Sequence, residues 1–136
     1  MNRHDALQQA FAHAQYLIDG GLELRVGECD PAIDRWLQER GAHSGALITA
    51  YNPAGQLRSE GQNRQAQHQL LAAVSELGMR WARGSATGDG WPVEPMLVLL
   101  DVTEQGAQGL CRRFGQAAML WLAQGRAPEL IWTQRS

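Results

Sequence analysis

The sequence predicts an α+β fold built on one mostly antiparallel sheet, and two patterns lead to this prediction. Residues 46–51 and 96–100 are continuously apolar, as in central strands that are buried on both faces. Two further stretches begin with helix-capping residues, Ser59 and Thr103, and each lies between two predicted strands. A chain of 136 residues has the length of one ordinary domain, so we expect a single domain over residues 1–136.

The first forty residues predict a helix, a strand and a second helix. Asp5 is placed to cap a helix that runs to about Ile18, because apolar residues recur there at helical spacing. Alternating apolar and charged residues over 22–26 indicate a strand with one buried face. Pro31, a favoured residue in a first helical turn, opens a short helix over 31–40.

From residue 46 onward the predicted order is strand, helix, strand, strand, helix, strand. Ser59 and Gln62 form an S-x-x-Q capping box for the first helix, which ends at Gly78, and Gly115 ends the helix that Thr103 caps. The strands are expected at residues 46–51, 79–83, 96–100 and 118–122, with a last edge strand at 130–132. This order is that of a ferredoxin-like split β-α-β core. The helix–strand–helix segment is then an N-terminal extension, and the last strand is a C-terminal edge strand.

Composition and charge restrict the class of partner. The formal net charge is −2 and the sequence pI is about 6.0, which argues against generic nucleic-acid binding. All twelve basic residues are arginine, a bias that we attribute to a GC-rich genome at most positions. Bidentate recognition of an anion by arginine therefore applies only to particular side chains.

The sequence indicates no cofactor, metal site or membrane segment. Cys29 and Cys111 stand far apart without a CxxC motif, and the four histidines lack the spacing of metal ligands. No apolar run approaches the roughly 20 residues of a membrane span, and the N-terminus lacks an apolar signal core. We therefore expect a cytoplasmic protein.

The predicted topology brings three separate loops to one end of the sheet. These are the segment after Tyr51, a long loop over residues 84–95, and the segment over 114–116. Polar and aromatic residues collect there, and we take as candidate ligand-binding residues Tyr51, Asn52, Ser59, Asn63, Arg64, Trp91, Glu94 and Gln116. The backbone N–H groups at the start of the Ser59 helix would favour a negative group at this end.

Several of these residues also have a purely structural interpretation. Asn52 and Pro53 form a common turn signal, and Trp91 would cover the open end of the core. The amides of Asn63 and Gln116 would be solvated or would satisfy loop backbone groups. Measurements of stability and of binding are both needed to separate the two interpretations.

The same residues resemble a known family. The stretches Leu47-Ile48-Thr49-Ala50-Tyr51-Asn52-Pro53, Ser59 with Asn63-Arg64, Trp91-Pro92-Val93-Glu94-Pro95 and Phe114-Gly115-Gln116 carry the resemblance. It is to a family of small bacterial proteins catalogued as domain of unknown function 3293, and it covers roughly residues 14–122. Family members often have a serine shortly after the Trp-Pro pair, whereas here Glu94 is followed by Pro95 and Met96. The resemblance implies no reaction, because the family has no assigned activity.

Three functions compete on these observations. The first is binding of a small anionic or nucleotide-like ligand at this end of the sheet. The second is an enzyme that uses Glu94 as general acid or base, although no nucleophile–base motif accompanies it. The third is a protein- or nucleic-acid-interaction adaptor, in which the edge strand at 130–132 could pair two copies of the chain into a homodimer.

Overall fold

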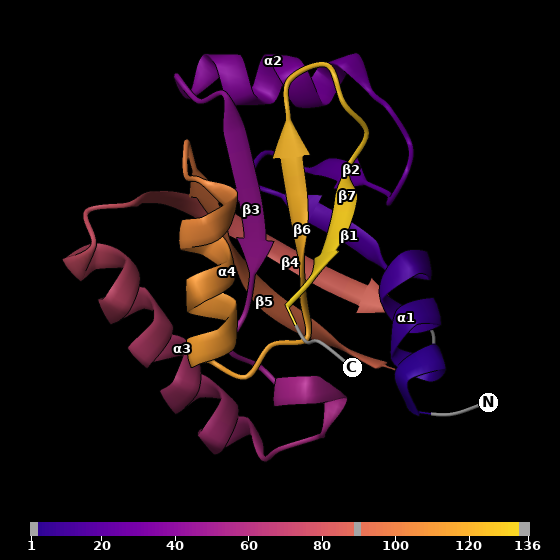
Figure 1. Cartoon of the computed structure of the whole chain (residues 1–136), viewed down its shortest axis with the longest axis vertical. Helices are drawn as coiled ribbons and strands as arrows, with labels where there is room; N and C mark the ends of the chain where they lie inside the picture. The colour runs from indigo at the N-terminus through magenta and orange to yellow at the C-terminus, as the bar shows by residue number, and fades with distance from the viewer. Residues whose placement is uncertain (1–2, 89–90, 134–136) are drawn as a thin grey trace.

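The structure is a computed structural model, and it describes the backbone of residues 3–88 and 91–133 (Figure 1). Four helices, seven strands and one short 3₁₀ turn make up the described chain. In chain order these are α1 Arg3–His13, β1 Gln15–Ile18, β2 Leu22–Leu24, α2 Pro31–Glu39, β3 Ser44–Ile48, η1 Pro53–Gly55, α3 Glu60–Glu76, β4 Arg80–Gly88, β5 Trp91–Leu100, α4 Glu104–Arg113, β6 Ala118–Ala123 and β7 Glu129–Trp132.

All seven strands belong to one curled sheet in which every neighbouring pair is antiparallel. The strand order is β2-β1-β4-β5-β3-β6-β7. The two continuously apolar runs contribute to β3 and β5, which pair with Ala46 opposite Leu99 in the middle of the sheet. The prediction that both runs are central strands is therefore confirmed, although β3 ends at Ile48 rather than at residue 51.

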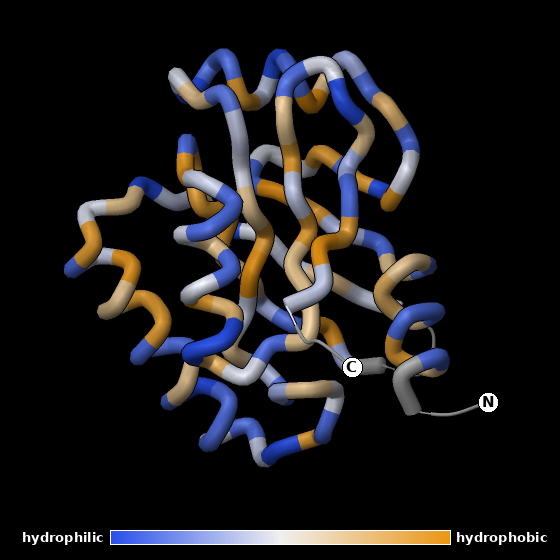
Figure 2. The backbone as a smooth tube through the Cα atoms, viewed as in Figure 1, coloured by the Kyte–Doolittle hydropathy of each residue, from blue (hydrophilic) through white to orange (hydrophobic). Residues whose placement is uncertain are grey.

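The two faces of the sheet bury two separate apolar clusters. Side chains alternate along a strand, so Leu47 contributes to the cluster beneath α2, and Ile48 to the cluster beneath α3 and α4. Figure 1 shows α3 and α4 together on one face of the sheet, with α2 across the end where β3 begins. The hydropathy colouring shows apolar stretches along the central strands (Figure 2). This double burial explains why β3 and β5 show no polar alternation.

The helix ends follow the predicted capping residues. The Ser59 hydroxyl accepts from the Gln62 amide at 3.1 Å, and the complete capping box is present. Thr103 caps α4 in the same way, and Pro31 stands in the first turn of α2. An apolar face that runs along α3 from Ala66 to Leu77 is expected from the spacing of its apolar residues, but Leu77 at the end of the helix is 58% exposed. None of the helices in the described residues has the length and apolar character needed to cross a bilayer.

The predicted first helix is wrong in its second half. α1 ends at His13, and Gln15–Ile18 forms strand β1, which pairs with both β2 and β4. Gly20 and Gly21 both have positive φ and make the turn of the β1–β2 hairpin. Asp5 lies within the first turn of α1, which begins at Arg3, rather than before its first residue. The N-terminal extension is therefore helix, strand, strand, helix.

The predicted long loop over residues 84–95 is mostly strand. β4 and β5 pair in one register as far as Ala86 opposite Glu94 and, after a register shift, again at Gly88 opposite Trp91, so Glu94 stands on a strand. The glycine and small residues of this segment predict a loop, and Pro95 cannot donate to a ladder. Its carbonyl accepts from the Thr49 hydroxyl at 2.8 Å, on the side where β3 has already ended, so no strand there requires an N–H group. Asp89 and Gly90 lie outside the described residues.

Replacing Leu99 tests the central position of β5. Its side chain is fully buried, so we expect Leu99→Ala to lower the free energy of unfolding by about 2–5 kcal/mol, through lost burial and a residual cavity. Urea unfolding of the variant measures this change. Leu57→Ala is a matched control, because the Leu57 side chain is 66% exposed. A loss below about 0.5 kcal/mol for Leu99→Ala would contradict the central position.

Candidate functional site

A pair of buried asparagines fixes the chain where it leaves β3. The backbone N–H of Asn52 donates to the side-chain oxygen Oδ1 of Asn63 at 2.9 Å. In return, the side-chain nitrogen Nδ2 of Asn63 donates to the side-chain oxygen Oδ1 of Asn52, also at 2.9 Å. Only 5% of Asn52 and 3% of Asn63 is exposed. Asn52 has the left-handed backbone conformation, with φ 43° and ψ 62°, which asparagine tolerates better than most residues. The first turn of α3 is thereby tied to the end of β3.

Asn52 also reaches across to the hairpin of β4 and β5. Its Nδ2 donates to Glu94 Oε2 at 2.8 Å, and its Oδ1 accepts from the Arg58 amide at 2.9 Å. The side chain therefore holds three separate segments, and it sets the orientation of the Glu94 carboxylate.

The loop after Asn52 is interlocked with the segment between α4 and β6. The Ala54 amide donates to the Gly115 carbonyl at 3.0 Å, and Gln116 Nε2 donates to the Tyr51 carbonyl at 3.1 Å. Gly115 has φ 68°, and a Cβ there would lie 3.1 Å from the Pro53 Cβ. Glycine is therefore required at this position both for its conformation and for the close approach. Ala54 has φ 55°, a strained conformation of the kind that often occurs at functional sites.

The structure brings five of the eight predicted site residues into one connected group: Tyr51, Asn52, Asn63, Glu94 and, bonded to the Tyr51 carbonyl, Gln116. The Tyr51 hydroxyl donates to Glu60 at 2.9 Å, and burial together with that hydrogen bond raises the Tyr51 pKa. The other three predicted residues do not join the group. Ser59 caps α3, Arg64 is exposed, and the side chain of Trp91 lies outside the described residues.

A cavity of about 820 Å³ lies between α1 and the sheet, next to this group. Among the predicted residues whose side chains the structure describes, Glu94 and Gln116 line it. Figure 1 shows α1 beside β7 and the far end of β4. The polar lining comprises Gln9, His13, Gln15, Tyr16, Arg25, Thr49, Thr87, Glu94 and Gln116, and the apolar lining includes Phe11, Met96, Met119, Leu120 and Leu130.

Helix α1 covers the cavity through few contacts. Among its described side chains only Leu7 and Phe11 are partly buried. The Phe11 ring stacks on Trp132 with 5.6 Å between centroids, and the Tyr16 hydroxyl donates to the Phe11 carbonyl at 3.1 Å.

The cavity contains groups of both charges. Glu94 supplies a carboxylate, and Arg25 supplies a guanidinium that also pairs with Glu23 at 3.3 Å. Burial, and secondarily the Glu94 charge, raises the pKa of Tyr16 above its usual range, so that its hydroxyl keeps its proton and acts as a donor. Among the residues that the structure describes, no group of three or more His, Cys, Asp or Glu side chains could hold a metal ion.

Sequence reasoning missed the N-terminal part of this site. The cavity is also lined by His13, Tyr16 and Arg25, and none of these is among the predicted site residues. The sequence pattern places Tyr16 in a helix, whereas the structure places it in strand β1. The alternation of Tyr16 and Ile18 with polar or exposed neighbours is the only signal that could have identified β1.

The comparisons with known proteins give one match. A family model described as "Protein of unknown function (DUF3293)" matches residues 48–119, a range that contains all eight predicted site residues. Helix α1, Arg25 and β7 lie outside this range. No curated protein and no solved structure matches the chain.

Replacing Asn63 tests the structural role of the asparagine pair. Asn63→Ala leaves the Asn52 N–H buried without its partner, so we expect a loss of about 1–3 kcal/mol in the free energy of unfolding. Gln65→Ala is a matched control on the same helix, because Gln65 is exposed. Urea unfolding measures both variants, and equal stabilities would show that the pair does not hold the loop.

Proposed function

The chain belongs to the DUF3293 family of proteins of unknown function, and from the geometry of its site we propose that it binds a small anionic or nucleotide-like molecule. The binding site in this proposal is the cavity between α1 and the sheet. Its volume of about 820 Å³ lies within the range of ligand pockets in proteins, roughly 300–1,000 Å³.

The observation that carries the proposal is the fixed Glu94 carboxylate. Asn52 is itself held by Asn63, and it donates to Glu94 at 2.8 Å, so the carboxylate is oriented before any ligand arrives. A preoriented polar group in a mostly apolar cavity loses little entropy on binding. Packing alone gives no reason for a carboxylate at this place.

The lining supports a ligand with three kinds of group. Glu94 accepts hydrogen bonds from N–H or O–H donors, as on the edge of a nucleobase. Arg25 supplies the charge that an anionic group needs. Met96 and Leu120 offer an apolar surface for a planar or aliphatic body.

We also infer that β3 to β6 form a ferredoxin-like split β-α-β unit. The order of these four strands across the sheet, β4-β5-β3-β6, supports this inference, as does the helix that follows β3 and the helix that follows β5. In such a unit the end of β3, the start of β5 and the start of β6 lie at one end of the sheet.

The enzyme alternative depends on the same carboxylate. A general acid or base must be oriented and within reach of its substrate, and the Asn52 contact provides the orientation. Turnover of a bound ligand by the intact protein, lost in Glu94→Gln, would favour this alternative over binding alone.

The proposal predicts a ligand whose affinity depends on Glu94. Nucleotides and phosphorylated metabolites are screened by thermal shift, and the affinity of each hit is measured by calorimetry. Glu94→Gln keeps an acceptor for Asn52 but removes the charge, so we expect a loss of roughly tenfold or more in affinity with little change in melting temperature.

Glu76→Gln is the matched control, because Glu76 is exposed near the end of α3. It should bind each ligand as the wild type does. If no compound raises the melting temperature, or if Glu94→Gln binds every hit with unchanged affinity, the proposal is wrong.

A further inference from the structure

Four oxygen-bearing side chains form what we call the inner wall of the cavity beneath α1: Tyr16, Thr49, Glu94 and Gln116. Tyr16, Thr49 and Gln116 are at most 7% exposed, and Glu94 is partly buried. Arg25, by contrast, is exposed and lies at the mouth of the cavity. The hydrogen-bonding capacity of the inner wall therefore decides what a ligand must present there.

The two hydroxyl groups of the inner wall have already used their protons. The Tyr16 hydroxyl donates to the Phe11 carbonyl at 3.1 Å, and the Thr49 hydroxyl donates to the Pro95 carbonyl at 2.8 Å. A hydroxyl has one donor and two acceptor lone pairs. What remains on both oxygens is therefore the capacity to accept.

The amide of Gln116 is fixed with its nitrogen toward the protein. Its Nε2 donates to the Tyr51 carbonyl at 3.1 Å and to the Phe114 carbonyl at 3.5 Å, which uses both of its hydrogens. Its Oε1 accepts from none of the described residues, and no fully buried side-chain oxygen or nitrogen among them lacks a partner. This oxygen therefore keeps accessible surface, which we place in the cavity that Gln116 lines.

Glu94 and Gln116 lie near each other because consecutive residues hold them. Asn52 donates to the Glu94 carboxylate at 2.8 Å, and the carbonyl of Tyr51 accepts from Gln116. A carboxylate has about four lone-pair sites and no donor, so the Asn52 contact does not saturate it. Two acceptors side by side in a mostly apolar cavity call for hydrogen-bond donors from a ligand.

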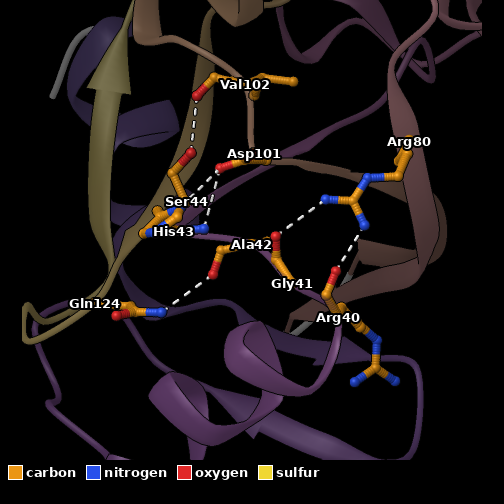
Figure 3. Close-up of polar contacts among 9 residues, drawn as sticks. All are labelled: Arg40, Gly41, Ala42, His43, Ser44, Arg80, Asp101, Val102 and Gln124. Carbon is orange, nitrogen blue, oxygen red and sulfur yellow. Dashed lines mark hydrogen bonds and ion pairs between the residues drawn. The ribbon is translucent and has the colours of Figure 1, made fainter.

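The arginines at the opposite end of β4 do not supply these donors. Arg40 and Arg80 line a separate hollow of about 440 Å³ where α2 ends. Arg80 donates to the Arg40 carbonyl at 2.6 Å and to the Gly41 carbonyl at 3.3 Å (Figure 3). Among the described residues that line the cavity, Arg25 is the only arginine, and it pairs with Glu23 at 3.3 Å. The cavity thus has acceptors on its inner wall and its cation at the mouth.

We propose that the inner wall binds the guanine base of a nucleotide, an inference that rests on the proposed function of the same cavity. Guanine carries a ring N–H and an adjacent amino group on one edge, so two neighbouring donors meet Glu94 and Gln116. Adenine and cytosine have a ring acceptor next to their amino group, and uracil has its N–H between two carbonyls. Each of these would bring an acceptor against the acceptors of the wall. The phosphate then extends toward Arg25 at the mouth.

Calorimetric titration of the full chain with guanosine, inosine and adenosine monophosphates tests the choice of base. Inosine monophosphate lacks only the exocyclic amino group of guanine and is therefore a matched ligand control. We expect it to bind roughly tenfold more weakly than guanosine monophosphate, because one buried acceptor loses its donor. Adenosine monophosphate, which places an acceptor against the wall, should bind roughly a hundredfold more weakly.

Glu94→Gln tests whether the carboxylate reads the base. The change replaces one acceptor oxygen by a donor, so the preference for guanosine over inosine monophosphate should fall below about threefold. Glu76→Gln, which alters an exposed carboxylate of α3, should keep the full preference. Circular dichroism melts verify that both variants are folded.

The inference is overturned if inosine or adenosine monophosphate binds as tightly as guanosine monophosphate, or if Glu94→Gln keeps the full preference. If guanosine monophosphate does not bind while another compound binds in a Glu94-dependent way, the inference fails and the proposed function stands. If no compound raises the melting temperature, both fail.

Discussion

The reciprocal hydrogen bonds between Asn52 and Asn63 fix the direction in which the chain leaves β3, and the candidate site depends on that direction. Burial makes this loop conformation strongly preferred. A buried amide that loses its hydrogen-bond partner lowers the stability of the fold by its full desolvation penalty. Once Asn52 is fixed, its Nδ2 orients Glu94. The strained turn at Ala54 then follows, held by the Gly115 carbonyl. A single pair of amides thus connects the fold to the chemistry of the cavity.

The two ends of the sheet have different chemical character. At one end a carboxylate faces a large, mostly apolar cavity beneath a thinly packed helix. At the other end a smaller hollow, whose lining includes Arg40 and Arg80, lies where α2 ends and β4 begins. In an antiparallel sheet neighbouring strands run in opposite directions, so each end of the sheet carries the starts of some strands and the ends of others. Different loops, with different side chains, therefore collect at the two ends.

Much of the core of this fold could be predicted from local chemistry. The capping residues Ser59 and Thr103 indicate the starts of α3 and α4. Strands that are buried on both faces have no alternation of apolar and polar residues, and this pattern identifies β3 and β5. The meeting of Asn52 with Glu94 also followed, because the topology places their segments at one end of the sheet.

The remainder depends on contacts distant in sequence. β1 is a four-residue strand that pairs with β2 and with β4, and only the second partner, some seventy residues away, places it in the sheet. Arg80 closes the end of α2 from a different element, a contact that no capping motif encodes. The cavity arises where α1 crosses the curled sheet, so its lining could not be derived from periodicity.

Native-state hydrogen exchange at the Asn52 amide tests the central constraint most directly. This amide donates to a buried side-chain oxygen at 2.9 Å rather than to a strand neighbour. We predict that it exchanges only on global unfolding, with the same protection as the amides of Leu47 in β3. Exchange at the rate of an exposed turn would contradict the account, because the loop would then open without the rest of the fold.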